Sequence, residues 1–229
     1  MLDSEKVDQF YQLIDSKYYS DWDKPDIILL ISPNHFHAEE NNIETICDST
    51  ILKYQSNYVN TSNKLRLLWV KCNNNEKIFY SRWETLQTYE HGIWEHFKYI
   101  EKYFSDSQVI PVITPSFKFS AVDNILPNIN NLKGNILVIA SVDFAHYQPE
   151  KQTLENDERS IETLKSSTID KWEIAQWIDA DCPACLYLIQ YLANEQWQRP
   201  ELWWRDSSST ILWEDIWEEN TSRIFMWYE

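Results

Sequence analysis

A run of five apolar residues, 136–140, passes directly into the segment 141–146, which carries an Asp and a His, and strongly limits how this chain can fold. Gly134 precedes the run and Pro149 follows it, and a short apolar run bounded in this way is typical of a strand buried on both faces. A second such run, 26–31, also ends in polar residues. Two doubly buried strands favour a sheet covered by helices on each side, which is an α/β fold.

Helical and strand-like patterns alternate along most of the chain. We predict a single three-layer α/β/α domain with a central mixed sheet over residues 1–229, because no linker rich in Pro, Gly or Ser interrupts the pattern. The expected helices cover 4–20, 90–100, 121–132, 151–166, 170–178 and 183–192. The expected strands cover 26–31, 65–71, 107–114, 136–140, 208–213 and 222–228, with a Trp-rich connector at 197–206.

Composition excludes several classes of function. The chain has 2 glycines, too few for the Gly-rich loops that bind nucleotide phosphates in two common motifs. Its formal net charge of −16 repels nucleic acid and anionic membrane surfaces, so neither is an expected partner. Aromatic residues at this density are expected in the core or at an interface, and an exposed group of the 12 tryptophans would indicate a homodimer or another protein partner.

The N-terminus and the cysteines bear on location. No apolar run reaches 18 residues, and residues 1–10 lack the basic and apolar regions of a signal peptide. Four cysteines in such a chain are typical of reduced thiols. We therefore expect a cytoplasmic protein without a membrane span.

Five side chains suited to metal binding or acid–base chemistry fall at strand exits or helix starts: His35, His91, Asp143, His146 and Cys182. Imidazole and thiolate ligands suit iron, copper or zinc, and not magnesium. An Asp and a His three residues apart can also form an acid–base pair or a structural couple. His96, on the apolar face of the helix at 90–100, is expected to be a core histidine.

Five stretches carry more specific patterns: 31–35, 90–97, 109–112, 139–147 and 181–183. In this order they resemble the [GS]-P-[NS]-H, E-H-S-[IL]-E-[VM]-[HQ]-L, I-V-P-I, S-S-D-[FL]-[SC]-H-[WY] and Cys-Gly segments of the Memo family. That family is also called AmmeMemoRadiSam system protein B. The resemblance extends over roughly residues 26–228.

The resemblance implies a fold related to class III non-haem iron extradiol dioxygenases. It implies metal ligands at His35 and Cys182, in a pocket lined by Asp143 and His146, and iron or copper as the metal. Proteins of the AMMECR and radical-SAM types accompany the family, so the resemblance also implies them as partners.

The chain departs from the family pattern at its start. Residues 1–25 contain no histidine, so the family's first strand and its P-H-A-G-Y motif, which supplies one metal ligand, have no counterpart there. The Cys-Gly segment is Cys182-Pro183, and one Ser of the S-S-D segment is Val142. The metal site is therefore expected to lack a ligand, unless His37 or His91 replaces it.

Three functional hypotheses follow, and the sequence leaves open whether the protein is an enzyme. The first is a non-catalytic or partner-dependent Memo-like module with a reduced metal site, or with no metal at all. The second is an iron- or copper-dependent oxidoreductase with metal ligands His35, His146 and Cys182, in which His146, Asp143 and His91 are the catalytic residues. The third is a redox CxxC at Cys182 and Cys185, which predicts a disulfide or a readily alkylated thiol.

Overall fold

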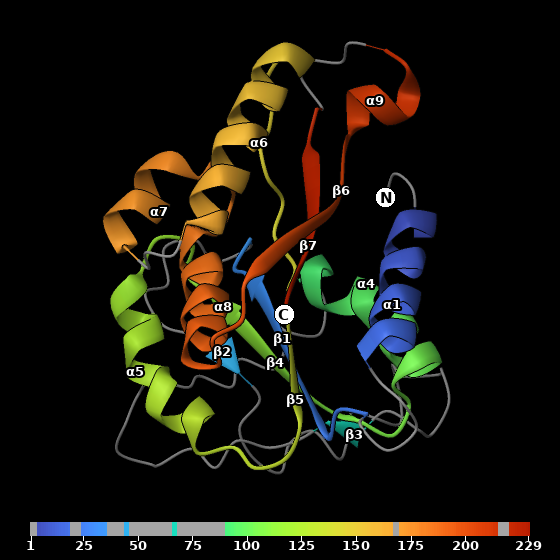
Figure 1. Cartoon of the computed structure of the whole chain (residues 1–229), viewed down its shortest axis with the longest axis vertical. Helices are drawn as coiled ribbons and strands as arrows, with labels where there is room; N and C mark the ends of the chain where they lie inside the picture. The colour runs from blue at the N-terminus through green and yellow to red at the C-terminus, as the bar shows by residue number, and fades with distance from the viewer. Residues whose placement is uncertain are drawn as a thin grey trace. The chain divides into compact units, whose positions relative to one another are not determined.

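A computed structural model of the 229-residue chain describes residues 4–18, 24–35, 44–45, 66–67, 90–166, 170–214 and 220–229. Helices and a largely parallel sheet confirm the predicted α/β fold (Figure 1). The elements are α1 (Ser4–Tyr18), β1 (Ile27–Pro33), β2 (Glu44–Thr45), β3 (Arg66–Leu67), α4 (His91–Tyr103), β4 (Gln108–Thr114), α5 (Phe119–Asn130), β5 (Ile136–Ala140), α6 (Glu150–Lys165), α7 (Lys171–Trp177), α8 (Pro183–Glu195), β6 (Pro200–Ser207), α9 (Ser208–Leu212) and β7 (Ser222–Tyr228).

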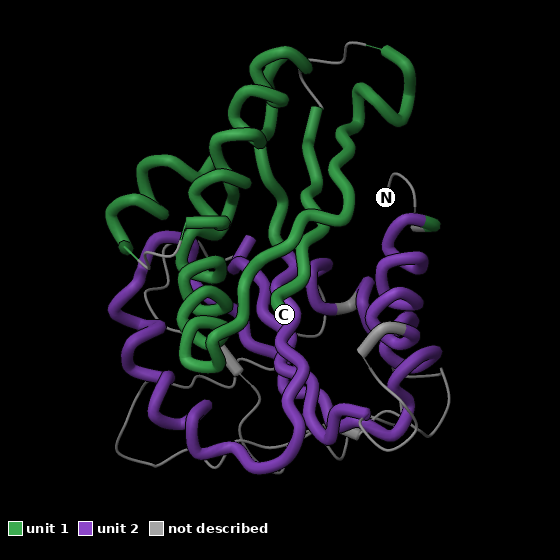
Figure 2. Tube along the Cα trace, viewed as in Figure 1, with its two compact units in different colours: residues 1–5, 142–229 green, residues 6–141 purple. Residues whose placement is uncertain are grey.

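The chain divides into two compact units, coloured separately in Figure 2. One unit comprises residues 6–141 and is called the sheet unit below. The other comprises residues 142–229 together with 1–5 and is called the hairpin unit. Each unit is described by itself.

The sheet unit is built around β1. This strand pairs in parallel with β4 on one side and β5 on the other, while β2 runs antiparallel to β4, so the described sheet is mixed as predicted. All seven residues of β1 are buried, as expected for a strand covered on both faces. The strand at 65–71 is described only where β3 pairs with β4, and the rest of that prediction lies outside the described residues.

Helices α1 and α4 cover one face of this sheet and α5 lies on the other side (Figure 1). Alternate β1 residues Ile28 and Leu30 pack against Ile93 and Ile100 of α4 in one buried cluster. Tyr11 joins the same cluster from α1. The helix spacing seen in the sequence thus matches the face that each helix buries.

His96 is half-buried and packs against Tyr11 of the core, so the prediction of a core histidine is met in part. Its Nδ1 atom lies 2.8 Å from the Tyr11 hydroxyl, which ties α4 to α1. Burial, with a smaller contribution from the nearby Lys98 charge, lowers the pKa of His96 to about 4. The ring is therefore neutral at ordinary pH.

The hairpin unit contains α6 to α9 and a two-stranded antiparallel sheet of β6 and β7. Two local predictions were wrong here. Residues 208–213 were expected as a strand, but Ser208–Leu212 is helix α9, because Ser207 and Thr210 form a reciprocal capping box that starts a helix. Most of the expected connector at 197–206 is strand β6.

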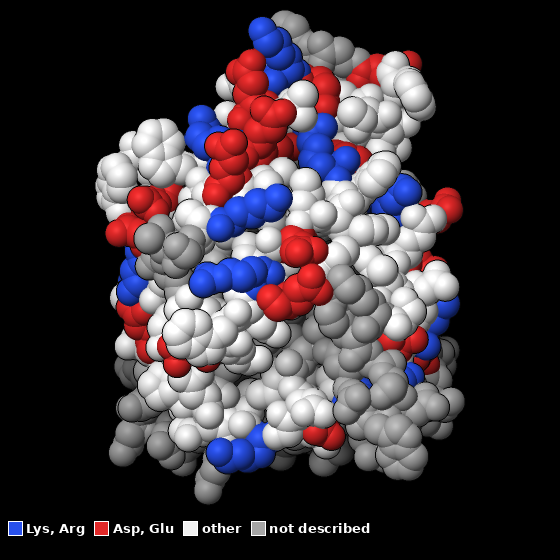
Figure 3. Space-filling model, viewed as in Figure 1, with Lys and Arg blue, Asp and Glu red and all other residues white. Residues whose placement is uncertain are grey.

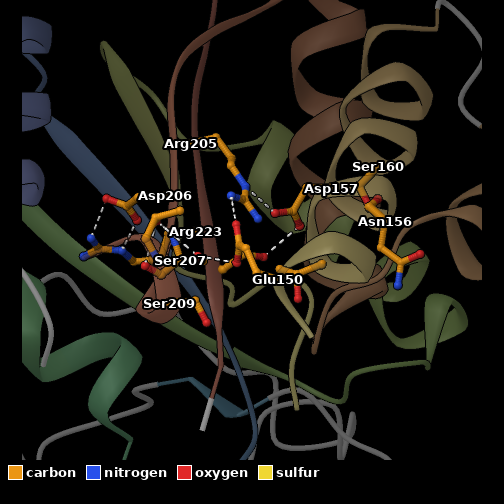
Figure 4. Close-up of polar contacts among 12 residues, drawn as sticks. Glu150, Asn156, Asp157, Ser160, Arg205, Asp206, Ser207, Ser209 and Arg223 are labelled. Atoms are coloured by element: carbon orange, nitrogen blue, oxygen red, sulfur yellow. Dashed lines mark hydrogen bonds and ion pairs between the residues drawn. The ribbon is translucent and has the colours of Figure 1, made fainter. Parts of the chain in front are cut away.

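A buried polar network joins the β6–β7 sheet to α6 (Figure 4). Arg205 of β6 donates from Nε to Asp157 (2.6 Å) and from Nη1 to Glu150 (2.7 Å), both on α6. Ser207 donates to the second oxygen of Glu150, and Ser222 of β7 donates to Asp157 at 2.7 Å. The charges are thus paired and hydrogen-bonded, which buried charges require.

Three exposed aromatic residues adopt left-handed backbone conformations: Tyr147 (φ 54°), Trp197 (φ 60°) and Trp213 (φ 59°). Their exposed fractions are 74%, 85% and 91%. Bulky residues are uncommon in this region, where glycine is the usual choice. Trp213 occupies it as the C-terminal cap of α9.

Acidic side chains gather over α6 in the view of Figure 3, where Glu155, Glu158 and Glu162 are exposed. This surface accounts for part of the net charge of −16. Within the described part of the chain, no helix combines the length and apolar character needed to cross a bilayer.

Candidate functional site

The first candidate site lies where β1 and α4 approach each other in the sheet unit. His35 follows the end of β1 by two residues, and Glu90 is the N-terminal cap of α4, directly before His91. The His35 Nδ1 atom is 2.8 Å from Glu90 Oε1, and the two imidazole ring centroids are 4.4 Å apart. Two histidines separated by 56 positions in the sequence are thus brought together (91 − 35 = 56).

Glu90 is 2% exposed, and four hydrogen bonds engage its carboxylate. Oε1 accepts from Ser32 Oγ (3.1 Å), His35 Nδ1 and the Gly92 amide (3.2 Å), and Oε2 accepts from the His35 amide (3.2 Å). Burial alone would raise the pKa of Glu90, but the hydrogen bonds and charge of His35 and the Gly92 amide outweigh it and lower that pKa. Glu90 is therefore a carboxylate at neutral pH.

The charge of Glu90 determines the tautomer of His35. An ionised carboxylate can only accept hydrogen bonds, so the proton of the neutral imidazole must lie on Nδ1. Nε2 is then the unprotonated nitrogen of the ring, which is the form that binds a metal ion. A carboxylate that holds one nitrogen of a histidine in this way is the usual companion of a metal-binding imidazole.

His35, Glu90 and His91 together could hold a metal ion, since one donor atom from each lies within 4.8 Å of the others. The two imidazoles are exposed and Glu90 is buried. Because both oxygens of Glu90 already accept hydrogen bonds, we assign it the orienting role and the two imidazoles the ligand role.

The second candidate site lies in the hairpin unit, just after the end of β5. Asp143, His146 and Asp181 form another group with donor atoms within 4.8 Å. The Asp181 amide donates to the Asp143 carbonyl at 3.0 Å, and β-bridges join Phe144 to Ala180 and His146 to Thr221. These backbone contacts explain how Asp181 reaches the Asp143–His146 pair.

The pKa of His146 is raised. Burial would lower it, but the adjacent Asp143 carboxylate, with smaller contributions from Asp181 and Asp179, outweighs burial. The His146 Nε2 atom lies 3.9 Å from Asp143 Oδ2. Chemically this is a proton-holding imidazole beside carboxylates, suited to acid–base work or metal binding.

Cys182 caps the N-terminus of α8 and forms a disulfide with Cys185. The disulfide is one of the two outcomes that the CxxC hypothesis predicts. Both cysteines are 0% exposed, so a thiol from solution has no direct access to either sulfur. In this state Cys182 has no thiolate to offer to a metal ion.

A family comparison adds to this geometry. The model of the Memo-like protein family matches residues 8–179, which is most of the chain. The chain belongs to the Memo-like family.

Curated Memo-like relatives are distant. A MEMO1 family protein of Sulfolobus acidocaldarius is 25% identical over 146 residues, covering 62% of this chain and 49% of that protein. One from Pyrobaculum arsenaticum is 25% identical over 162 residues, covering 68% of this chain and 55% of that protein. The chain spans about half the length of the curated relatives it matches.

The predicted site residues of this Memo-like chain fall in both units. His35 and His91 lie together in the sheet unit, and Asp143 and His146 lie together in the hairpin unit, which also holds Cys182. His37, the other proposed replacement ligand, lies outside the described residues.

Two residues of these clusters, Glu90 and Asp181, were not assigned a role from the sequence. Glu90 carries a usable signal, since it is the first residue of the expected helix and the start of a helix is where a capping residue stands. Asp181 carries none, because its place beside Asp143 depends on backbone pairing between distant segments.

Proposed function

We propose that this chain is a partner-dependent Memo-like module that binds a transition metal ion at a reduced site, with His35 and His91 as imidazole ligands. The observation that carries the proposal is the buried Glu90 carboxylate 2.8 Å from His35 Nδ1. That contact fixes the ring, with Nε2 as the unprotonated nitrogen that can bind a metal ion.

The side chains fit iron or copper. Imidazole nitrogen is a good donor for both, and a bound ion of either kind would supply a Lewis-acid and one-electron redox centre. In this arrangement His91 takes the place of the histidine that the family carries in its P-H-A-G-Y motif. Glu90 holds the His35 proton on Nδ1 at every pH at which the carboxylate is ionised.

The reduced site is favoured over a three-ligand enzyme because the Cys182 sulfur is held in a disulfide and buried. Two exposed imidazoles leave further coordination positions for a ligand from a partner protein. The accompanying AMMECR-type and radical-SAM proteins of the family are the partners we propose.

The alternative is an iron- or copper-dependent oxidoreductase that uses His35, His146 and Cys182. One observation favours it: His146 is placed beside Asp143 and has a raised pKa, which suits a residue that gives and takes a proton. The two proposals differ in the ligands that they require.

The test is titration of the metal-free protein with copper(II), and anaerobically with iron(II), by isothermal calorimetry. Four variants are compared: His35→Ala, His91→Ala, His146→Ala and Cys182→Ser. We expect one ion per chain, with binding abolished in the first two variants and unchanged in the last two.

Loss of binding in His146→Ala and Cys182→Ser, with His91→Ala unaffected, would instead establish the three-ligand oxidoreductase site. Absence of binding by the wild-type chain before and after reduction with a dithiol would reject both metal proposals. Circular dichroism of each variant separates a lost ligand from a lost fold.

A further inference from the structure

We infer that Ser32 is a positioning residue for the His35 imidazole. We also infer that position 92 on α4 must be glycine, because only glycine leaves room for the Ser32 hydroxyl. Ser32 is 0% exposed and belongs to β1, three residues before His35. Its hydroxyl reaches the carboxylate that orients the ring. This role rests on the metal site proposed above. Ser32 and Gly92 would influence the tautomer of the ring and so decide which of its nitrogens can bind a metal ion.

The Ser32 hydroxyl has two acceptors within reach. It lies 3.1 Å from Glu90 Oε1 and 3.3 Å from the Pro33 carbonyl. A hydroxyl has a single proton, and the shorter, charge-assisted bond to the carboxylate is the stronger of the two. Ser32 therefore helps to hold the Glu90 carboxylate in the orientation in which it contacts His35 Nδ1.

Gly92 makes room for this bond. A Cβ atom at position 92 would overlap the Ser32 hydroxyl oxygen, and would also lie 3.2 Å from the Ser141 hydroxyl. At the same time the Gly92 amide donates to Glu90 Oε1 at 3.2 Å. Any side chain at position 92 would therefore displace the strand hydroxyl from the carboxylate that both residues hold.

The consequence concerns the proton of His35. With Ser32 and Gly92 in place, Glu90 remains an acceptor and the imidazole keeps its proton on Nδ1. If the carboxylate rotates away, His35 loses the contact that favours this tautomer. The two residues thus control which nitrogen is presented to a ligand without touching the ligand.

Nitrogen-15 NMR of the histidine rings, on metal-free protein at a pH where His35 is neutral, tests the inference. We expect wild-type His35 to be the Nδ1–H tautomer and Ser32→Ala to be a mixture of both tautomers. Glu90→Leu removes the acceptor altogether and should likewise produce a mixture of both tautomers. Ser141→Ala is the matched control. It removes the other hydroxyl that lies near Gly92, which is not among the donors to Glu90 described above, and it should leave the tautomer unchanged.

A reciprocal exchange provides the second test. Ser32→Gly removes the hydroxyl from the strand, Gly92→Ser crowds it from the helix, and the double variant supplies one hydroxyl from the helix side. We expect each single variant to weaken copper(II) binding about 10- to 100-fold, the range for residues that orient a ligand. The double variant should recover most of that loss.

A wild-type Nδ1–H tautomer that Ser32→Ala leaves intact would overturn the inference, as would a double variant whose losses simply add. The NMR result does not need bound metal. If the wild-type chain does not bind copper(II), the proposed function is wrong. The role of Ser32 is still tested, because the tautomer is measured on metal-free protein.

Discussion

At the residue scale, the environment of His146 leads to a direct test. Among the carboxylates that raise the pKa of His146, Asp143 contributes most and Asp179 least. We therefore expect Asp143→Asn to lower the His146 pKa, and Asp179→Asn to lower it less. Proton NMR titration of the ring measures both. Equal shifts in the two variants would show that diffuse charge, and not the Asp143 contact, controls the ring.

The sign of the pH dependence follows from the raised pKa. A histidine that gains carboxylate neighbours on folding binds its proton more tightly in the folded state. Its contribution to stability is therefore fully present below the ordinary histidine pKa and is lost as pH rises through the folded value.

His96 has the opposite dependence. Its pKa is lowered to about 4 in the folded protein. Between about pH 6.5 and about pH 4, the imidazole is therefore protonated in the unfolded chain but not in the folded protein. We expect acidification over this range to remove about 3 kcal/mol of unfolding free energy through His96 alone.

Urea unfolding of wild type and His96→Gln at about pH 7 and about pH 4.5 measures the His96 contribution. The variant should lose less stability than wild type in acid. Tyr11→Phe, which keeps the imidazole and removes its hydrogen-bond partner, is the control and should retain the acid sensitivity. An identical acid loss in wild type and His96→Gln would contradict the prediction.

Single residues were predictable from the sequence where they stand at the ends of strongly patterned elements. His35 and Asp143 follow apolar runs, and the pairing of β1 with β5 confirms both runs as strands. The state of Cys182 was not predictable, because a disulfide and a free thiol have the same sequence. Nor was the role of Ser32, which depends on the distance between a strand and a helix.

At the element scale, the β6–β7 sheet depends on α6 through Arg205. Replacing Arg205 with Met would leave Asp157, whose side chain is 1% exposed, as a buried carboxylate without its cation. We expect a loss of about 3 kcal/mol at neutral pH, the lower end of the cost of breaking a buried pair. Denaturant unfolding followed by circular dichroism measures it.

Two controls accompany Arg205→Met. Lys151→Met alters a lysine of α6 whose side chain is 90% exposed, and it should cost about 0.5 kcal/mol or less. Acidification to a pH that protonates Asp157 should shrink the Arg205→Met effect, because a neutral carboxyl no longer needs the guanidinium. An effect that persists unchanged in acid would indicate lost packing of the arginine stem instead.

Elements were predictable to the extent that a single local pattern decides them. The apolar runs at β1 and β5 and the helical spacing of α4 and α6 each have one good solution. The segment 208–213 is compatible with two secondary structures. Its apolar residues fit a strand, while its Ser207–Thr210 capping box starts a helix. Strand β6 was not predicted, because a segment rich in aromatic residues fits a strand or a connector equally well.

At the scale of the whole molecule, the α/β class and the Memo-like family were predictable, since both depend on the order of several segments and tolerate errors in any one. The grouping of candidate ligands was only partly predictable. Parallel strands place their carboxyl ends at one edge, which brings His35 toward the start of α4. Asp181, the third member of the Asp143–His146 cluster, could be assigned only from the tertiary contacts.

The scarcity of glycine has a consequence for how this fold could change. With 2 glycines in 229 residues, three left-handed positions are filled by Tyr147, Trp197 and Trp213, each carrying a steric cost of about 1–2 kcal/mol. Trp213→Gly should therefore be more stable than Trp213→Ala by about 1 kcal/mol in thermal or denaturant unfolding. Equal stabilities would mean that the cap relaxes out of the left-handed region.

Stability could be gained at these three positions during evolution. A point mutation to glycine at any of the three would relieve crowding without disturbing the core, because all three rings face solvent. A lineage of this protein could in this way absorb a harmful substitution at Ser32 or Glu90 long enough for a compensating change on α4 to arise.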